Sequence, residues 1–296
     1  MRYPSGPSSR GASSSELPSS PLDVAVVGAG RVGCSVARAL LARGHRVVAA
    51  TVASHDSARR VLDVLGHVPI VEPEDAALAA NVVVIAVPDD AIADAAGRVR
   101  AGLEDGSVVL HTSGLHGTSV LGPCAPKVAA IHPAQTIPEP TTDLTDVYFG
   151  VTAPEHMREW AWWFVGELGG IPFDVPEEQR ALYHAALVMA SNFTVALAAD
   201  AGDLLGNAEA LTPLLRQTVE NVSRLGGDQA LTGPVVRGDA GTVRAHVAAL
   251  TAQAPHLLEA YVANARRALD RAFKSGRLDE SKAKDVADAL EEAMVR

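Results

Sequence analysis

A short apolar strand that runs directly into a glycine-rich turn constrains the fold of this chain most. Residues 23–27 read Asp-Val-Ala-Val-Val, and a complete G-x-G-x-x-G follows at Gly28, Gly30 and Gly33. The first glycine permits a tight turn, the second lets backbone approach a phosphate, and the third lets the next helix pack against the strand. Residues 32–41 then carry apolar side chains at helical spacing, so this helix would face the phosphates with its N-terminus. The context favours a dinucleotide-binding unit over a chance glycine-rich turn.

The end of the second predicted strand indicates which dinucleotide binds. An acidic residue about twenty residues after the glycines would hold the ribose hydroxyls of NAD. Residues 51–60 have no acid at that strand end and supply small hydroxyl residues and two arginines, Arg59 and Arg60. Because arginine pairs well with a 2'-phosphate, we predict NADP (NADPH) as the cofactor. Alternatively, both arginines are solvated helix residues and Asp56 caps that helix.

Several residues are predicted to contact this cofactor. They come from the glycine-rich turn, the second strand end and two further strand ends. The full set is Gly28, Ala29, Gly30, Arg31, Val32, Gly33, Ser54, Arg59, Val87, Pro88 and Ser113.

Composition limits the classes of function. A chain of 296 residues with 48% hydrophobic content can form two domains with sizeable cores. Its net charge of −10 gives no general attraction to nucleic acid or anionic membranes, so an anion site must be built locally. Cys34 and Cys124 form no disulfide framework and fit a reducing cytoplasm. The scattered histidines show no metal-ligand spacing, and we predict no metal.

Two segments bear on location and assembly. Residues 1–21 are rich in Ser, Pro and Gly and lack the apolar core of a signal peptide, so we predict a disordered leader. Residues 185–201 are the most hydrophobic helical stretch, but they are alanine-rich and interrupted by polar residues. That composition suits burial against protein better than lipid, so we predict no membrane span. The same weakly charged stretch would suit a homodimer contact.

Two halves of the chain differ in pattern. Apolar runs alternate with helical patterns up to residue 175, which predicts a doubly wound, mainly parallel sheet of the α/β Rossmann class over 22–175. The run Val82–Val87 is expected at the centre of the sheet, and Pro88 with Asp89 and Asp90 would end it and cap the next helix. The predicted strands are 24–27, 46–52, 68–71, 82–87, 108–111, 128–131 and 148–152.

The second half, 176–296, is predicted to be an all-α C-terminal domain. After Pro176 the strand signals stop and apolar residues recur at helical spacing. The predicted helices are 178–206, 209–225, 240–250, 254–274 and 280–295.

Polar side chains stand at two predicted strand ends. His111-Thr-Ser113-Gly114 follows one strand, and His132-Pro133 ends the next. A hydroxyl and an imidazole at these positions could hydrogen-bond a nicotinamide amide or a substrate oxygen. Equally, His111 and Ser113 could be turn residues that satisfy local backbone groups.

Two features of the helical half could contact substrate. His184, Ser191 and Asn192 would share one face of an otherwise apolar helix, either as a structural network or as a substrate-facing patch. On a glycine-containing loop further on, Arg237 could grip a carboxylate with both arms of its guanidinium. The alternative is a surface pair of Arg237 with Asp239, in which Asp239 or Thr242 caps the next helix. The predicted substrate contacts are Ser191, Thr232, Arg237 and Asp239.

Together these motifs resemble one family. From Leu22 to the C-terminus, the chain resembles Rossmann-like proteins whose helical part is a domain of unknown function (family 2520), within the 6-phosphogluconate-dehydrogenase-like superfamily. The resemblance rests on residues 28–33, 87–89, 111–114, 132–133, 183–184, 191–192 and 232–239. It implies NAD(P)-dependent hydride transfer and helical domains that dimerise.

Relatives in the wider superfamily sharpen the expected roles. Ketopantoate reductases carry a lysine and two asparagines along this helix; here the positions hold His184, Val188 and Asn192, so the lysine and one asparagine are missing. Prephenate dehydrogenases use the histidine of a comparable His-Pro turn on substrate, which supports His132. Pyrroline-5-carboxylate reductases are a third relative.

The resemblance leads us to expect reduction of a small 2-oxo acid by NADPH, with ketopantoate as the best single substrate. Arg237 would grip the carboxylate, Asn192 would orient the carbonyl oxygen, and His184 would donate the proton while the nicotinamide delivers hydride. Ser113 and His132 would hold the nicotinamide end or the substrate. Two alternatives are an imine reductase of the pyrroline-carboxylate type and a non-catalytic NADP(H)-binding sensor or partner protein.

Overall fold

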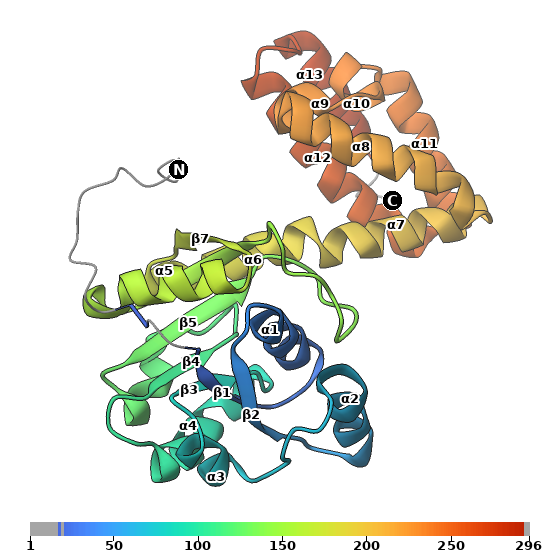
Figure 1. The fold of residues 1–296 in the computed structure, drawn as a ribbon. Helices are drawn as coiled ribbons and strands as arrows, with labels where there is room; N and C mark the ends of the chain where they lie inside the picture. The colour runs from blue at the N-terminus through green and yellow to red at the C-terminus, as the bar shows by residue number, and fades with distance from the viewer. Residues whose placement is uncertain (1–16, 19–20, 293–296) are drawn as a thin grey trace. The chain divides into compact units, whose positions relative to one another are not determined.

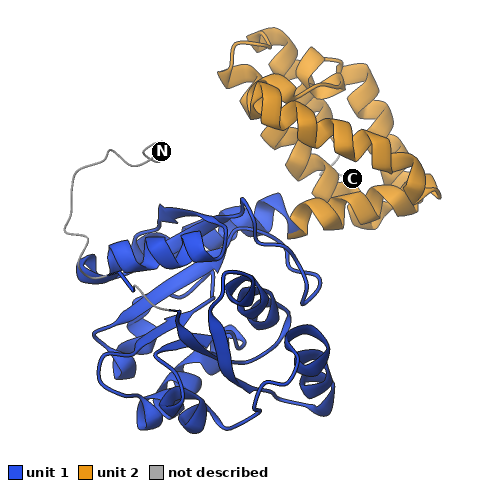
Figure 2. Cartoon of the chain, viewed as in Figure 1, with its two compact units in different colours: residues 1–191 blue, residues 192–296 orange. Residues whose placement is uncertain are grey.

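The protein consists of two compact units. The computed structural model describes residues 17–18 and 21–292, and the chain divides between Ser191 and Asn192 (Figure 2). We call residues 21–191 the sheet unit and residues 192–292 the helical unit. The predicted leader lies outside the described residues except for 17, 18 and 21, and it stays a prediction. The predicted domain boundary at 175/176 marks the end of the strands, whereas the compact units meet sixteen residues later.

The sheet unit is built on seven strands in the order β2-β1-β3-β4-β5-β6-β7 (Figure 1). Only β6 runs antiparallel to its neighbour β5, and every other pair is parallel. The carboxyl ends of β1 to β5 therefore meet at one edge, where a doubly wound sheet binds its ligand. The strands are β1 Asp23–Val27, β2 Arg46–Thr51, β3 Val82–Ile85, β4 Val108–His111, β5 Val128–Pro133, β6 Tyr148–Thr152 and β7 Ile171–Asp174.

Helices cover both faces of this sheet, because successive strand residues point to opposite sides. Val24 and Val26 of β1 join the core under α1, α2 and α5, while Ala25 and Val27 join the core under α3 and α4. The helices are α1 Arg31–Ala42, α2 His55–Leu65, α3 Pro73–Leu78, α4 Ile92–Gly102, α5 Arg158–Glu167 and α6 Arg180–Ala190, with short 3-10 turns η1 Asp89–Ala91, η2 Thr118–Cys124, η3 Glu155–Met157 and η4 Glu177–Gln179. The predicted α/β Rossmann sheet is confirmed.

Four local predictions need correction. The predicted strand 68–71 is a single bridge from Ile70 to Ala50, because Pro69 within it has no N–H to donate to a ladder. Strand β7 was not predicted. Helix α2 is capped by Ser54 rather than Asp56, since the Ser54 hydroxyl accepts the Ser57 N–H. Asp89 and Asp90 do not cap α4, because they belong to η1, and the N-cap of α4 is Ala91, which makes no side-chain cap hydrogen bond.

The helical unit contains no strand among its described residues, as predicted. Helices α11, α12 and α13 pack around Val243, Val262, Val286 and Leu290. The unit comprises α7 Asn192–Leu205, η5 Ala208–Leu211, α8 Thr212–Leu225, α9 Gly227–Ala230, α10 Pro234–Arg237, α11 Ala240–Gln253, η6 Pro255–Leu257, α12 Leu258–Lys274 and α13 Glu280–Glu291.

The predicted long helix 178–206 is divided at Ser191, which has ψ −77° and separates α6 from α7. By length and hydropathy, 177–205 is the one helical stretch of the described chain that could cross a membrane, with mean hydropathy 1.4. One such helix is weak evidence for a span, and the absence of a span stays a prediction.

Candidate functional site

The three glycines of the motif meet three different surroundings. A side chain at Gly28 would place its Cβ 2.7 Å from Cγ1 of Val87, and the residue has φ +92°. At Gly33 a Cβ would lie 2.5 Å from the carbonyl oxygen of Gly28. At Gly30, by contrast, no protein atom lies within 4 Å of the same position. Gly28 and Gly33 are therefore required by the fold, whereas Gly30 borders open space.

That open space lies at the N-terminus of α1. Gly30 is the N-cap of this helix and provides no side-chain cap, and the first turn contains no acidic residue. The N–H groups and the dipole of the first turn thus stay available to an anion. The glycine-rich turn fits the pyrophosphate of a dinucleotide.

The end of β2 holds a hydroxyl where an NAD site would place an acid. Thr51, its last residue, accepts the Gly28 N–H at 2.9 Å through Oγ1. Sequence reasoning did not single out Thr51. Its hydrogen bond joins the end of β2 to the glycine-rich turn.

Of the two arginines on α2, Arg59 is exposed and Arg60 is half-buried. Burial raises the pKa of the Cys34 thiol in α1, and the charge of Arg60 partly opposes that rise. Arg60 therefore lies near the helix that follows the glycine-rich turn. The Ser54 hydroxyl, predicted to contact the cofactor, is engaged in capping α2.

The turn after β4 is held by His111. The Ser113 N–H donates to His111 Nδ1 at 3.1 Å, so the ring carries its proton on Nε2 and donates it to the Gly117 carbonyl oxygen at 2.8 Å. Burial lowers the pKa of His111 to about 4, which keeps the ring neutral. The Ser113 hydroxyl in turn accepts the N–H groups of Leu115 and His116. These bonds match the local, turn-satisfying interpretation of His111 and Ser113.

Two histidines meet Gly114 in the same turn, and Tyr183 joins them through a hydrogen bond to one of them. His132 Nδ1 lies 2.8 Å from the Tyr183 hydroxyl, and the rings of His132 and His184 meet edge to face at 5.9 Å. A Cβ at Gly114 would lie 2.7 Å from His184 Cδ2 and 3.0 Å from His132 Nε2. The structure thus brings together His132 and His184, which are 52 positions apart. Sequence reasoning noted Tyr183 but gave it no role.

The charge state of His132 is set by its surroundings. Burial lowers the pKa of His132 to about 3, and the positive charges of Arg180 and of His184 act in the same direction. His132 is therefore a neutral imidazole near pH 7. With Nδ1 occupied by Tyr183, its Nε2 faces the Gly114 turn and can meet a ligand.

A buried arginine fixes this arrangement. Arg180, 1% exposed, donates to three backbone carbonyl oxygens, those of His116 at 2.8 Å, Ser113 at 3.0 Å and Gly150 at 3.3 Å. Burial lowers the pKa of Arg180 to about 10, so it stays charged at neutral pH. No predicted role was assigned to Arg180, because nothing in its local sequence marks it as buried.

Glu177 anchors the start of α6 to the same loop. Its carboxylate accepts the N–H groups of Thr118 at 2.8 Å and Ser119 at 3.1 Å. Because α6 carries Tyr183 and His184, this contact holds both against the turn after β4.

The remaining predicted residues divide between the units. Ser191 donates its hydroxyl to the Leu187 carbonyl oxygen at 2.8 Å at the end of α6. Asn192 begins α7 in the helical unit. Thr232 and Arg237 line a cavity of about 460 Å³ there. Asp239 caps α11, accepting the Thr242 N–H at 3.0 Å and its hydroxyl at 2.7 Å.

Within 17–18 and 21–292, no group of three or more His, Cys, Asp or Glu side chains is placed to hold a metal ion.

Comparison with protein-family models covers both halves of the chain. Residues 8–133 match a Rossmann-like domain, and residues 147–268 match a domain of unknown function, DUF2520. The chain is a Rossmann-like protein with a DUF2520 domain. No protein with a curated function matches this DUF2520 protein. The narrower relationship to ketopantoate or pyrroline-5-carboxylate reductases stays a prediction.

Solved structures share the fold of this DUF2520 protein. BF3122 from Bacteroides fragilis, named as a candidate NADP oxidoreductase, is 23% identical with a TM-score of 0.72 and covers 84% of this chain and 98% of its own. Protein TM1727 from Thermotoga maritima is 26% identical with a TM-score of 0.66, covering 86% and 100%. An imine reductase from Streptomyces aurantiacus is 17% identical with a TM-score of 0.53, covering 91% and 93%. The fold is one that NAD(P)-dependent oxidoreductases use.

Proposed function

We propose that this DUF2520 protein is an NADPH-dependent oxidoreductase that reduces a small 2-oxo acid. The observation that carries the proposal is the open space at Gly30 beside an uncapped N-terminus of α1. The histidine cluster stands at the same edge of the sheet. The ends of β1 and β5 are three strand spacings apart, about 14 Å, which an extended dinucleotide can span.

The cofactor would lie along this edge. Gly28, Gly30 and the first turn of α1 would hold the pyrophosphate, and Arg59 and Arg60 would pair with a 2'-phosphate. Val87, Pro88 and Ser113, at the ends of β3 and β4, would border the nicotinamide half. When bound, NADPH supplies hydride from its nicotinamide ring.

His184 is the proposed proton donor. His132 is held neutral, so it would donate or accept a hydrogen bond without changing charge. His184, half-buried and in edge contact with His132, is the second imidazole of the cluster. A histidine can supply a proton to a developing alkoxide near neutral pH.

Residues of the helical unit would hold the acid. Arg237 would grip its carboxylate, and Asn192 and Thr232 would contact its polar groups. Ser191, the last residue of the sheet unit, is the fourth predicted contact. The carboxylate of Asp239 is engaged with Thr242, so contact between Asp239 and substrate stays outside the proposal. Ketopantoate is our first choice of 2-oxo acid because of the family resemblance.

An imine reductase is the second candidate. The likeness in fold to the Streptomyces imine reductase covers nearly the whole of both chains. Such a reaction would need less from a proton donor, because an iminium already carries its proton. A non-catalytic NADP(H)-binding protein is the third candidate, and it predicts tight NADPH binding without turnover.

We also propose a homodimer through the helical unit, located in the cytoplasm, without nucleic-acid or membrane partners. Helix α8 has no buried residue and α7 has only Gly202. Their exposed large apolar side chains are Phe193, Val195, Leu197, Leu204, Leu205, Leu214, Leu215, Val219, Val222 and Leu225. An exposed apolar surface of this extent marks a site of interaction with another molecule.

The charged residues of α7 and α8 favour a second copy of this chain as the partner that buries this apolar surface. Helix α7 contributes two acidic residues, Asp200 and Asp203, while α8 contributes Arg216 and Arg224 with one acid, Glu220, and has a net positive charge. Each surface thus carries the opposite charges that a two-fold partner would present. Val219→Asp should convert a dimer to a monomer in sedimentation, whereas Lys284→Gln on α13 should not. A wild-type monomer at micromolar concentration would refute the homodimer.

One assay separates the candidate functions. Oxidation of NADPH, followed by its absorbance, is measured with a panel of 2-oxo acids and of cyclic imines. Turnover with oxo acids supports the proposal, turnover with imines alone supports the second candidate, and tight binding without turnover supports the third. His184→Ala should reduce kcat at least tenfold with NADPH affinity unchanged, whereas the exposed His67→Ala serves as control. Unchanged kcat in His184→Ala would remove His184 from the mechanism.

A further inference from the structure

A cavity within the helical unit gathers three cationic side chains. Arg237 comes from the end of α10, Arg277 from the turn before α13, and Lys282 from the first turn of α13. The cavity has a volume of about 460 Å³, enough for a small organic molecule. Two of these cations, Arg277 and Lys282, were not among the residues predicted from sequence.

The floor of the cavity is apolar and fixed. Val236 and Leu278 are buried and pack together with Ala272 of α12. Gly238 lets the loop after α10 approach α13, since a Cβ there would lie 2.7 Å from Cβ of Lys282 and 3.0 Å from Cδ1 of Leu278. The close approach brings Arg237 and Lys282 to the rim of one cavity.

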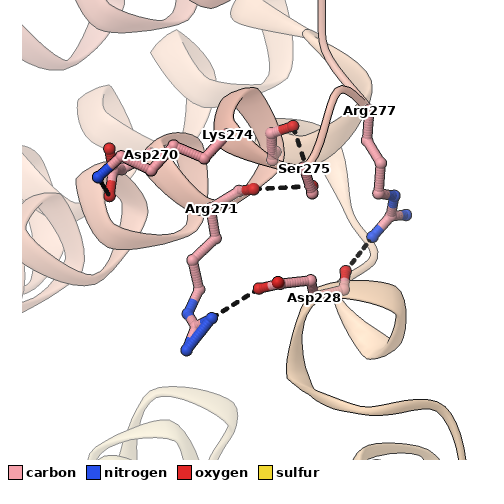
Figure 3. A network of polar contacts seen from close by, with 7 residues as sticks. Asp228, Asp270, Arg271, Lys274, Ser275 and Arg277 are labelled. Atoms are coloured by element: carbon pink, nitrogen blue, oxygen red, sulfur yellow. Dashed lines mark hydrogen bonds and ion pairs between the residues drawn. The ribbon is translucent and has the colours of Figure 1, made fainter. Parts of the chain in front are cut away.

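Arg277 keeps its charge uncompensated. One of its terminal nitrogens donates to the backbone carbonyl oxygen of Asp228, while the carboxylate of Asp228 pairs with Arg271 at 2.6 Å (Figure 3). The nearby acid is thus already neutralised by a different arginine. Arg277 is held by one hydrogen bond to a neutral group and has further N–H groups to offer.

The cavity has one carboxylate against three cations. Asp279 caps α13, accepting the Lys282 N–H at 2.9 Å, and its other oxygen lies 3.9 Å from the Lys282 ammonium group. Among the described residues Arg237 makes no side-chain hydrogen bond or ion pair, although its positive charge acts on Asp239, whose pKa is lowered first by the Thr242 hydrogen bonds and then by Arg237. The lining therefore carries an excess of two positive charges, in a chain whose net charge is −10.

We propose that this cavity binds a small organic dianion, either a phosphate monoester or a dicarboxylate. Two arginines can each bind an anion with paired N–H groups, and the lysine adds a point charge. Thr232 offers a hydroxyl at the same rim. A monocarboxylate would neutralise only half of the excess charge.

The inference rests on the proposed function through Arg237 alone. If Arg237 grips the carboxylate of the 2-oxo acid, Arg277 and Lys282 predict a second negative group on the same molecule. Ketopantoate, with one carboxylate, would then be a poorer substrate than an oxo acid with two anionic groups.

Binding is tested on the full chain by calorimetry at about pH 8 and low ionic strength. The probes are inorganic phosphate and succinate as dianions and acetate as monoanion, all with saturating NADPH to occupy the glycine-rich turn. We expect both dianions to bind at least tenfold more tightly than acetate, and Lys282→Gln to weaken phosphate binding about tenfold. Lys284→Gln, two positions along the same helix and paired with Asp288, is the matched control and should bind as the wild type does.

The outcomes separate this inference from the proposed function. Absence of phosphate binding, or equal binding by wild type and both Lys282→Gln and Arg277→Gln, overturns the cavity as an anion site. Equal affinity for acetate and succinate overturns the dianion class. Binding that depends on Lys282 supports the inference even if NADPH fails to bind or no oxo acid is reduced, and those two failures count against the proposed function instead.

Discussion

Replacing Gly30 by alanine tests the proposed cofactor site most directly. Its backbone has φ −80°, which alanine adopts without strain, and the added Cβ would meet no protein atom within 4 Å. The free energy of unfolding should therefore change by no more than about 0.5 kcal/mol. The methyl group would instead occupy the space in which a pyrophosphate must approach the backbone.

The expected loss of affinity follows from the hydrogen bonds that the methyl group would displace. A hydrogen bond to a charged phosphate contributes about 1.5–3 kcal/mol, so losing one raises the Kd for NADPH about 10- to 150-fold. The Kd is measured by NADPH fluorescence, and stability by urea unfolding of the same variant.

Substitutions of two further glycines serve as controls, one expected to lower the free energy of unfolding and the other to raise it. Gly33→Ala places a Cβ 2.5 Å from the Gly28 carbonyl oxygen and 2.9 Å from Cγ1 of Val26, so it should destabilise the protein by about 1–3 kcal/mol. Gly97→Ala, inside α4 with no atom within 4 Å, should stabilise it by about 0.5–1 kcal/mol and leave NADPH binding unchanged. If Gly30→Ala binds NADPH as tightly as the wild type, the cofactor does not lie at this turn.

Substitutions at three further residues test the buried arginine, the neutral histidines and the proposed 2'-phosphate contact. Arg180→Met should lower the free energy of unfolding by about 3 kcal/mol, because three backbone carbonyl oxygens lose their donor; Arg180→Lys should recover only part of it, and urea unfolding measures both. The pKa values of His111 and His132 lie below the ordinary 6.5, at about 4 and about 3, so the unfolded state takes up protons first as pH falls. Stability should therefore decrease from about pH 6.5 downward, by up to about 2 kcal/mol per histidine at pH 5, and His132→Gln should reduce that slope; a flat profile would contradict the lowered pKa values. Arg60→Ala should raise the Kd for NADPH about tenfold and leave that for NADH unchanged, whereas equal effects on both would argue against a 2'-phosphate contact.

The sequence predicts those elements whose local pattern and tertiary environment agree. Strand β1, the glycine-rich turn and α1 are clear because a buried strand, a tight turn and an amphipathic helix each leave their own signal. Strand β7, Ile171–Asp174, is short, contains Pro172 and lies at the sheet edge, so it lacks the apolar run of a central strand. No glycine or proline in the sequence marks the end of α6 at Ser191.

The candidate site could be predicted only in part. Strand ends pointed to His132 and Ser113, since parallel strands end at a common edge, and the spacing of polar residues on a helix pointed to His184. Arg180 could not be recognised, because its partners are backbone carbonyl groups from three separate segments. Lys282 and Arg277 reach the cavity of Arg237 because the loop after α10 approaches α13 closely at Gly238, and no local sequence pattern encodes that contact.

The division of the chain at Ser191 has an evolutionary consequence. The glycine-rich turn and His132, Tyr183 and His184 all precede it and belong to one folded body. Recombination after Ser191 could therefore replace the helical unit. The geometry between the glycine-rich turn and the imidazoles of the sheet unit would be kept. Under the proposed function, a lineage could thereby acquire a new substrate specificity in one genetic step and keep the residues proposed for hydride and proton transfer unchanged.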